Sequence, residues 1–329
     1  MCRKRILVIH SDVPPDAPPD ELDVLHEAAF MAGHLKSMGH EVSVMPFTAD
    51  LKQTKENILN FNPDFIFNLV ETMFGSGRLI HVAPSLFGYM NIPYTGCPAD
   101  AIYNTSNKLT AKKIMHGYGI PTAKYLTVKN IQKKEIYEGE SYIIKSVWEH
   151  ASVGIDEQKF KLLINRDEIS DLLKEKALSG NESFAEHYIE GREFNISVLG
   201  GKNGPQVLPF AEIRFVDYPE GKPKVVGYRA KWDESSFEFN HTVRSFDYTA
   251  SDRPLHDNLR KLCLDCWNVF NLKGYARVDF RVDAEGNPFV LEINANPCIS
   301  PDSGFIAACN QAEIPVQEVV KRILEEVCE

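Results

Sequence analysis

The sequence predicts an α/β N-terminal part with an open parallel sheet, followed by an α+β part with mostly antiparallel strands. Two observations support this prediction. Apolar strand-like runs alternate with helical patterns over residues 5–70, and this β-α-β-α-β order is typical of a parallel sheet. Near the C-terminal end, residues 276–282 and 289–294 alternate with a period of two around a turn-rich stretch, as in an antiparallel hairpin.

The composition is that of a globular chain with room for two or three subdomains: 329 residues, 43% hydrophobic and 25% charged. The formal net charge of -10 argues against generic nucleic-acid binding, because a polyanion is normally met by a basic surface. No signal-peptide pattern and no apolar run of membrane length is seen, so a cytoplasmic protein is expected. The seven cysteines lack zinc-site spacing and are expected to be reduced thiols.

The N-terminal part is expected to run in the order strand 5–10, helix 21–38, strand 41–45, helix 51–61 and strand 64–70. Ligands of open parallel sheets gather beyond the carboxyl ends of the strands. His10 and Glu71 lie at two such ends, so each is a candidate substrate contact, with a capping or loop role as the alternative.

Two lysines follow in positions that suit a nucleotide. Lys108 begins a helix expected to run to about residue 118, and Lys145 ends a strand at residues 142–145. The loop 151–154, which contains Ser152, comes next. Backbone amides and a lysine in such a place suit a phosphate, although a loop with one glycine is a weak signal by itself.

Glu186 and Glu193 lie on two strand-like runs joined by a turn at residues 190–191. They could accept hydrogen bonds from an adenine amino group and from ribose hydroxyls; solvated carboxylates on a strand are the commoner case. Further strands are expected at residues 209–216 and 224–228.

A polar stretch from Lys231 to Asp247 could form a mobile cover over a site. The helix expected at residues 255–270 carries Cys263 and Cys266 on one face. Core packing is the expected role of this pair, in preference to redox chemistry.

The C-terminal hairpin gathers polar groups on one face. Alternation places on that face Arg277, Asp279 and Arg281 of the first strand and Val290, Glu292 and Asn294 of the return strand. Folding about residues 285–286 pairs Asp279 with Glu292 and Arg277 with Asn294. Opposite carboxylates repel, and a shared hard cation such as Mg²⁺ would remove the conflict; a solvated polar face is the alternative.

Six motifs in sequence order are similar to those of one superfamily. They are NK at Asn107 and Lys108, IIK ending at Lys145, EHYIEGREF from Glu186, GYRAKW ending at Trp232, GYARVDF from Gly274 and LEINANP from Leu291. Together they resemble the ATP-grasp superfamily, and most closely its D-alanine:D-alanine ligase branch, over nearly the whole chain. The resemblance implies an ATP-grasp fold with a first-substrate subdomain at 1–105, a central lid at 106–195 and a catalytic, metal-binding subdomain at 196–329.

The resemblance also implies roles for the matching residues. ATP would contact Lys108, Lys145 and Ser152 through its phosphates, Glu186 and Ile189 through adenine, Glu193 through ribose and Lys231 through the γ-phosphate. Two Mg²⁺ ions, for which Mn²⁺ could substitute, would be held by Asp279, Glu292 and Asn294. Arg277 would stabilise the developing acyl phosphate and tetrahedral adduct, and Ser303 would receive the second substrate's carboxylate. A homodimer would follow the habit of the branch.

The sequence departs from the branch on the first-substrate side. A Gly-Gly-x-Ser-x-Glu signature is replaced by HSDVPPDAPPDEL at residues 10–22, and Cys298 stands where the branch has glycine. Ala151 and Trp232 replace the serine and tyrosine that link the phosphate loop to the cover. The wall near His10, Glu21 and Glu71 is therefore expected to select a different first substrate.

The sequence thus predicts an ATP-dependent ligase that joins an amino acid or small carboxylate to an amine, which could be an amino acid or dipeptide. The sequence is also compatible with three alternative functions. One is an authentic D-alanine:D-alanine ligase, favoured by the retained Ser303 and Arg277. The others are a non-catalytic nucleotide-binding protein and an ATP-grasp kinase that phosphorylates a hydroxyl.

Overall fold

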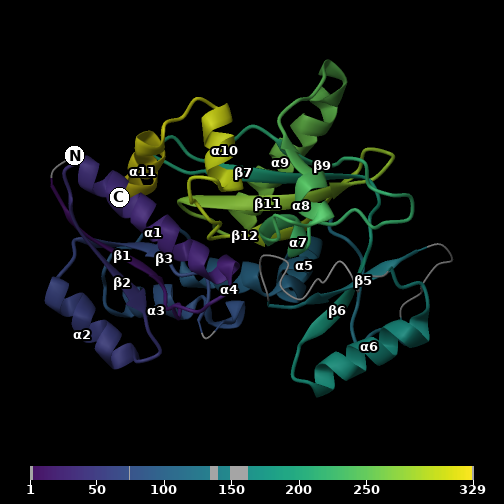
Figure 1. The fold of residues 1–329 in the computed structure, drawn as a ribbon, viewed down its shortest axis with the longest axis horizontal. Coiled ribbons are helices and arrows are strands. Elements are labelled where there is room, and N and C mark those ends of the chain that lie inside the picture. The colour runs from purple at the N-terminus through teal and green to yellow at the C-terminus, as the bar shows by residue number, and fades with distance from the viewer. Residues whose placement is uncertain (1–2, 74, 134–139, 149–161, 328–329) are drawn as a thin grey trace.

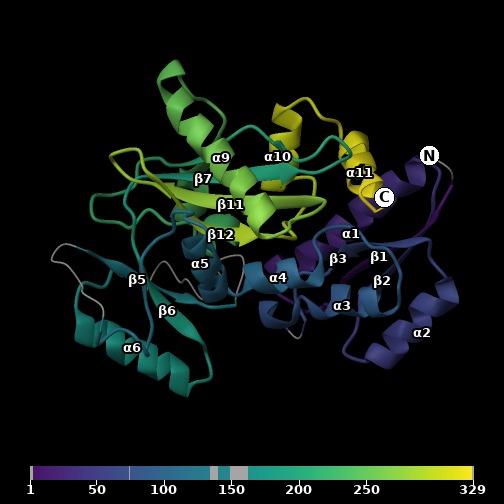
Figure 2. The same cartoon turned by 180° about the vertical axis from the view of Figure 1, so that it is seen from behind.

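The computed structural model describes residues 3–73, 75–133, 140–148 and 162–327. Three sheets organise the chain (Figure 1). Figures 1 and 2 show the N-terminal sheet at one end, a small central sheet with α6 at the other, and a large sheet above both. None of the helices in this described part combines the length and apolar composition that a membrane span requires.

The N-terminal sheet is parallel, as predicted, with the strand order β2-β1-β3. Its elements are β1 (Arg5–Ser11), α1 (Pro19–Ser37), β2 (Glu41–Phe47), α2 (Leu51–Phe61), β3 (Phe65–Leu69), η1 (Gly77–Leu79) and α3 (Val82–Tyr89). Helix α2 begins where the Asp50 carboxylate accepts a hydrogen bond from the Gln53 amide (2.9 Å) and ends at Asn62, whose φ of 51° is left-handed.

The central sheet is antiparallel, with the strand order β4-β6-β5. The elements around it are α4 (Ala99–Ser106), α5 (Lys108–Gly117), β4 (Tyr125–Leu126), β5 (Tyr142–Ser146), α6 (Arg166–Leu178) and β6 (Ser183–His187). Asn107 caps α5 by accepting a hydrogen bond from the Thr110 amide (2.9 Å), which fixes Lys108 at the first position of that helix.

The large sheet has the order β10-β9-β7-β11-β12, with β8 paired to β7. Its strands are β7 (Arg192–Leu199), β8 (Gln206–Val207), β9 (Ala211–Phe215), β10 (Thr242–Ser245), β11 (Tyr275–Val282) and β12 (Pro288–Asn294). Its helices are α7 (Arg229–Trp232), α8 (Phe237–His241), η2 (Ala250–Asp252), α9 (Arg253–Val269), α10 (Gly304–Gln311) and α11 (Val316–Glu325). The turn at residues 190–191 joins β6 of the central sheet to β7 of the large one.

The strand predicted at residues 224–228 is wrong: residues 224–227 have no regular structure, and α7 begins at Arg229. The backbone of Lys224 forms hydrogen bonds with side chains and not with a neighbouring strand. The Lys224 amide donates to the Tyr188 hydroxyl (3.1 Å), and the Lys224 carbonyl accepts from the Arg281 guanidinium. The polar stretch after Lys231 folds into α8 and β10.

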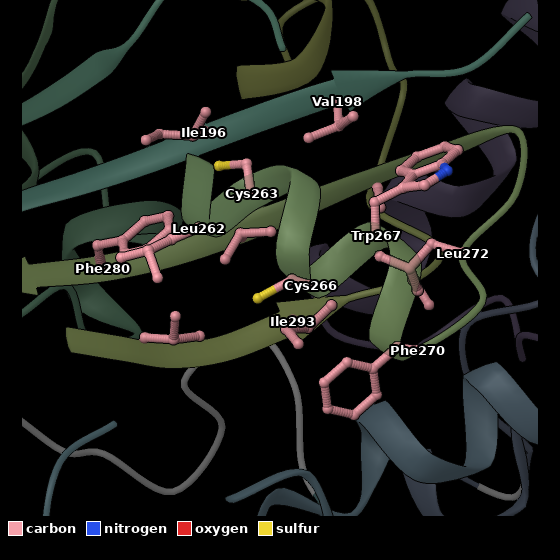
Figure 3. Close-up of a cluster of buried hydrophobic side chains, with 14 of the residues drawn as sticks. Ile196, Val198, Leu262, Cys263, Cys266, Trp267, Phe270, Leu272, Phe280 and Ile293 are labelled. Atoms are coloured by element: carbon pink, nitrogen blue, oxygen red, sulfur yellow. The ribbon is translucent and has the colours of Figure 1, made fainter. Parts of the chain in front are cut away.

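Helix α9 covers one face of the large sheet and buries the Cys263 and Cys266 pair (Figure 3). Both side chains are 0% exposed, and both thiols are free. They pack among apolar side chains that include Ile196, Phe280 and Ile293. Burial raises the pKa of Cys266 to about 12, so its thiol stays protonated at neutral pH. The predicted core role of the pair is confirmed.

Candidate active site

The hairpin of β11 and β12 has the predicted pairing at its polar end: Asp279 lies opposite Glu292 and Arg277 opposite Asn294. The register shifts between Asp279 and Phe280, so that Phe280 lies opposite Val290. This bulge leaves an extra residue in β12, and the prediction that Val290 shares the polar face is wrong. Val290 is 0% exposed and packs in the core beneath α9.

Arg277 and Asp279 form a bidentate ion pair on this face. The Arg277 Nε and Nη2 atoms donate to the two Asp279 oxygens at 2.7 and 2.8 Å. Burial by itself lowers the pKa of Arg277, but the charge and hydrogen bonds of Asp279 raise it above its ordinary value. The guanidinium is therefore held in a fixed orientation on the site face of the sheet.

The donor set of the face fits a hard cation. Asp279 and Glu292 supply carboxylate oxygens, Asn294 supplies an amide oxygen, and the register places the three side chains close together. The Lys108 Nζ lies 3.4 Å from the Glu292 Oε2, which brings the first residue of α5 to the same place. Helix α5 thus connects the hairpin with the central sheet.

Glu186 of β6 is the buried centre of a second charge cluster. The side chain is 1% exposed and contacts two lysines: the Lys112 Nζ lies 2.6 Å from its Oε1, and the Lys145 Nζ donates to its Oε2. Burial raises the pKa of Glu186, but the two lysines outweigh burial and lower it below its ordinary value. Glu186 is therefore an ionised acceptor beside the predicted phosphate lysine.

Lys112 was not predicted as a site residue. It lies one helical turn after Lys108 on the buried face of α5, and its side chain is 0% exposed. The available signal was the i, i+4 spacing of two lysines at a helix start, which puts both on one face.

Two further predicted nucleotide contacts, Ile189 and Glu193, lie in the connection from β6 to β7 and at the start of β7. Glu193 is buried and pairs with Arg281 (Oε2 to Nη2, 2.9 Å), and burial raises its pKa. Ile189 is 6% exposed in the connection from β6 to β7. Ser152 lies outside the described residues.

Lys231 lies on α7, in the segment predicted as a cover. Burial lowers the pKa of Lys231, and the nearby charge of Arg277 lowers it further, whereas Glu292 and Asp279 act in the opposite direction. The charges of these three hairpin residues therefore act on the Lys231 ammonium group.

Ser303 caps α10, where its hydroxyl oxygen accepts from the Ile306 amide (3.2 Å). Arg244 of β10 approaches the same helix end: its Nη2 lies 3.5 Å from the place that a Cβ at Gly304 would occupy. Burial and the charge of Arg277 lower the pKa of Arg244. Sequence reasoning missed Arg244, because strand β10 brings it to the site from a stretch predicted as a cover.

The first-substrate wall is rich in carboxylates. Ligand atoms of Glu27, Glu71 and Cys298 lie within 4.8 Å of one another. The Cys298 thiol donates to Asp23 (3.1 Å), and the Ile299 amide donates to Glu27 (2.7 Å). Glu27 was missed, although a carboxylate within the apolar stripe of α1 was a visible signal.

The candidates His10 and Glu71 lie at the carboxyl end of the parallel sheet. The Ser11 hydroxyl accepts hydrogen bonds from the amides of Glu71 and Thr72 (3.0 Å each), and this ties the strand end to the Glu71 loop. Burial and the charge of Asp23 raise the pKa of Glu71 to about 7.

His10 and Glu21 lie farther along this wall. His10 is buried, burial lowers its pKa, and its Nδ1 bonds to the Ser11 carbonyl (2.7 Å). Glu21 lies beside Gly75, where a Cβ would be 3.8 Å from its Oε1. Within the described residues, no hydrogen bond or ion pair joins His10 or Glu21 to Glu27, Glu71 or Cys298.

Comparisons with known proteins agree with this arrangement. Residues 114–325 match the family model described as D-ala D-ala ligase C-terminus. A D-alanine–D-alanine ligase of Carboxydothermus hydrogenoformans is 28% identical over 311 residues, which is 91% of this chain and 90% of the relative. An uncharacterized protein of Sinorhizobium fredii is 25% identical over 328 residues, covering 95% and 90%.

A solved D-alanine–D-alanine ligase from Bacillus anthracis, complexed with ATP, has the same fold, with a TM-score of 0.71 at 20% identity. The similarity covers 99% of this chain and 97% of that one. Because the family model matches well over half of the sequence, and the fold agrees from end to end, the chain belongs to the D-alanine–D-alanine ligase-like family of ATP-grasp enzymes, which are ligases that form a carbon–nitrogen bond.

Proposed function

We propose that this enzyme joins the carboxylate of an amino acid or other small acid to an amine through an acyl phosphate, with release of ADP and phosphate. The observation that carries the proposal is the hairpin face, where Arg277, Asp279, Glu292 and Asn294 lie together and Lys108 reaches Glu292. With a hard cation bound to its carboxylates, such a cluster would neutralise the charge of a phosphoryl group in transfer.

The residues around the face have complementary roles in the proposal. Lys108, Lys145 and Ser152 hold phosphates, and Lys231 contacts the γ-phosphate. Glu186 and the backbone at Ile189 bind adenine, and Glu193 binds ribose. Asp279, Glu292 and Asn294 would hold Mg²⁺, which when bound would supply the positive charge that activates the phosphate for transfer.

Two displacements make up the reaction. A carboxylate oxygen of the first substrate attacks the γ-phosphorus, and the bond from that phosphorus to ADP breaks. The amine nitrogen then attacks the acyl carbon, the carbon–oxygen bond to phosphate breaks, and the nitrogen loses a proton. Arg277, fixed by Asp279, stabilises the negative charge on the acyl oxygen during the second step.

The acidic wall supports a first substrate that carries an ammonium group. Burial and the charges of neighbouring carboxylates raise the pKa of both Glu27 and Glu71, and Asp23 contributes to both shifts. A bound ammonium group would favour the ionised forms of these carboxyl groups. On the opposite side, Ser303 and Arg244 flank the start of α10 and support an amine substrate with its own carboxylate.

An ADP-release assay with Mg²⁺ and single or paired amino acids tests the proposal. We expect turnover to require two substrates and Glu292→Ala to abolish it, with Glu285→Ala, in the turn of the same hairpin, as the control. Preferred turnover with D-alanine alone would identify a D-alanine–D-alanine ligase, the activity named for several relatives, and would contradict a distinct first substrate. A phosphorylated hydroxyl product would contradict amide formation.

A further inference from the structure

Lys112 is fully buried, unlike Lys108 and Lys145, the two lysines predicted to contact phosphates. Its side chain is 0% exposed, and its Nζ has three close acceptors: the Glu186 Oε1 at 2.6 Å, the Thr122 Oγ1 at 2.8 Å and the Ala123 carbonyl at 3.3 Å. The Thr122 hydroxyl gives its own proton to the Val290 carbonyl (2.7 Å). All three Lys112 partners therefore accept.

The Nζ donates hydrogen bonds to Thr122 and Ala123 and lies at ion-pair distance from the Glu186 carboxylate, an arrangement that favours the ammonium form of Lys112. Glu186 then lies between two cations, Lys112 and Lys145. The two are not equivalent. Lys145 is partly exposed, whereas Lys112 is enclosed by the connection at Thr122, which is itself bridged to β12.

This difference matters if Lys145 turns to a phosphate, as the proposed function requires. Glu186 would then lose one of its two partners while remaining buried. A buried carboxylate without a cation is strongly disfavoured, and so Lys145 would stay on Glu186 if it were the only partner.

We propose that Lys112 is a positioning residue: it provides a fixed counter-charge to Glu186 and thereby allows Lys145 to leave Glu186 for a phosphate of ATP. The inference rests on the proposed use of ATP and adds a residue that never touches the nucleotide. The two lysines of α5 thus have different partners: Lys108 lies beside Glu292, and Lys112 lies beside Glu186.

A double-mutant cycle on ATP binding tests this role. The dissociation constant of Mg·ATP is measured by calorimetry at pH 8 for the wild type, Lys112→Met, Glu186→Gln and the double variant. We expect Lys112→Met to weaken binding about tenfold or more in the wild-type background. In the Glu186→Gln background the same change is expected to cost less than about threefold, because Lys145 then has no carboxylate to hold it.

The pH dependence supplies a readout that a purely structural role does not affect. Removal of Lys112 takes away one of the two charges that lower the pKa of Glu186 against the effect of burial, so in Lys112→Met this carboxylate should take up a proton at a higher pH than in wild type. Protonation of Glu186 releases Lys145, and the loss of affinity relative to wild type should therefore shrink as the pH is lowered. Lys113→Met, the exposed neighbour on α5, is the matched control and should leave the dissociation constant unchanged. If Lys112→Met does not fold, Lys112→Gln, which keeps N–H donors without the charge, replaces it in the same cycle.

An equal loss of affinity in both backgrounds, with no pH dependence of the difference, would overturn the positioning role and leave the proposed function intact. A wild-type protein that does not bind Mg·ATP would overturn both.

Discussion

Burial and a neighbouring carboxylate act in the same direction at Glu71. Desolvation is the larger cause and the charge of Asp23 the second, and together they raise the pKa of Glu71 from 4.5 to about 7. Arg277 acts in the opposite direction without cancelling the effect. The site is therefore built at a cost in stability, which an ammonium group of a bound substrate would relieve.

This cost has a defined pH dependence. Between pH 4.5 and pH 7 the folded protein keeps a proton on Glu71 that the unfolded chain has lost, so the contribution of this group to the unfolding free energy falls as pH rises. Glu71→Gln removes the effect. We expect the stability of the variant, relative to wild type, to increase by up to about 3 kcal/mol from pH 5 to pH 8 in urea denaturation. A difference that is independent of pH, as expected for Glu56→Gln on the exposed face of α2, would contradict the raised pKa.

Arg244 is proposed to bind the carboxylate of the amine substrate. In the part of the chain that the structure describes, its side chain has no hydrogen bond or ion pair, and its guanidinium approaches the start of α10. With an amino acid as the amine substrate, Arg244→Met should raise the KM for that amino acid about tenfold and leave the KM for ATP unchanged. The corresponding amino acid amide should show no such change. Equal effects on acid and amide would contradict carboxylate binding, and Arg214→Met on β9 is the control.

At the scale of elements, the connection from β6 to β7 sets the geometry between the central and large sheets. Gly191 has a φ of 144°, and a Cβ there would overlap the Val282 carbonyl oxygen and lie 3.3 Å from the Asp283 Cα. Both neighbours are backbone atoms of the hairpin, so a side chain cannot be accommodated by rotation of a flexible group. Glu186 and Glu193 lie on either side of this contact.

Gly191→Ala should therefore affect both stability and nucleotide binding. Backbone strain and the overlap with β11 are expected to lower the unfolding free energy by roughly 2–3 kcal/mol and to weaken Mg·ATP binding. Denaturant unfolding and calorimetry measure the two effects. Gly204→Ala has a similarly positive φ (85°) but open space around it, so it should show strain alone. Unchanged ATP affinity in Gly191→Ala would show that this contact does not position the site.

The elements also show what sequence patterns can and cannot predict. The pairing of Asp279 with Glu292 was predicted from strand alternation and a fold about residues 285–286, and it is observed. Nearer the turn the register differs: Val282 lies opposite Pro288 and Phe280 opposite Val290, and the bulge restores the predicted pairing at Asp279. The bulge itself was not predictable, because one extra residue leaves no mark in an apolar run. The segment at residues 224–227 looked like a strand, but its hydrogen bonds go to side chains distant in sequence.

Contacts distant in sequence account for the missed residues as well. The roles of Lys112 and Arg244 depend on Glu186 and Gly304, which the fold brings to them from other elements. The predicted metal residues, in contrast, belong to one hairpin, and Lys108 belongs to a short motif at the start of one helix. Residues that act across elements are therefore the part of the site that single-sequence reasoning leaves out.

At the scale of the whole molecule, each of the three sheets supplies one part of the proposed centre. The parallel sheet presents Glu71, the central sheet presents Lys145 and Glu186, and the large sheet carries the hairpin face. Helix α5 links the last two through Lys108 and Lys112. Nucleotide binding between these sheets would bring charged groups from separate elements to one phosphoryl group.

If the hairpin face activates a carboxylate by phosphorylation, one carboxylate oxygen passes into the released phosphate, and an isotope-transfer measurement detects this transfer. The enzyme is incubated with Mg·ATP and a pool of amino acids and dipeptides whose carboxylates carry ¹⁸O, and both phosphate and condensation products are analysed by mass spectrometry. We expect products that have lost one water relative to their parts, and phosphate that contains one ¹⁸O atom for each amide bond formed; Glu292→Ala and excess chelator should abolish both. Amide formed with unlabelled phosphate, or label retained in a phosphorylated substrate without amide, would contradict the acyl-phosphate route.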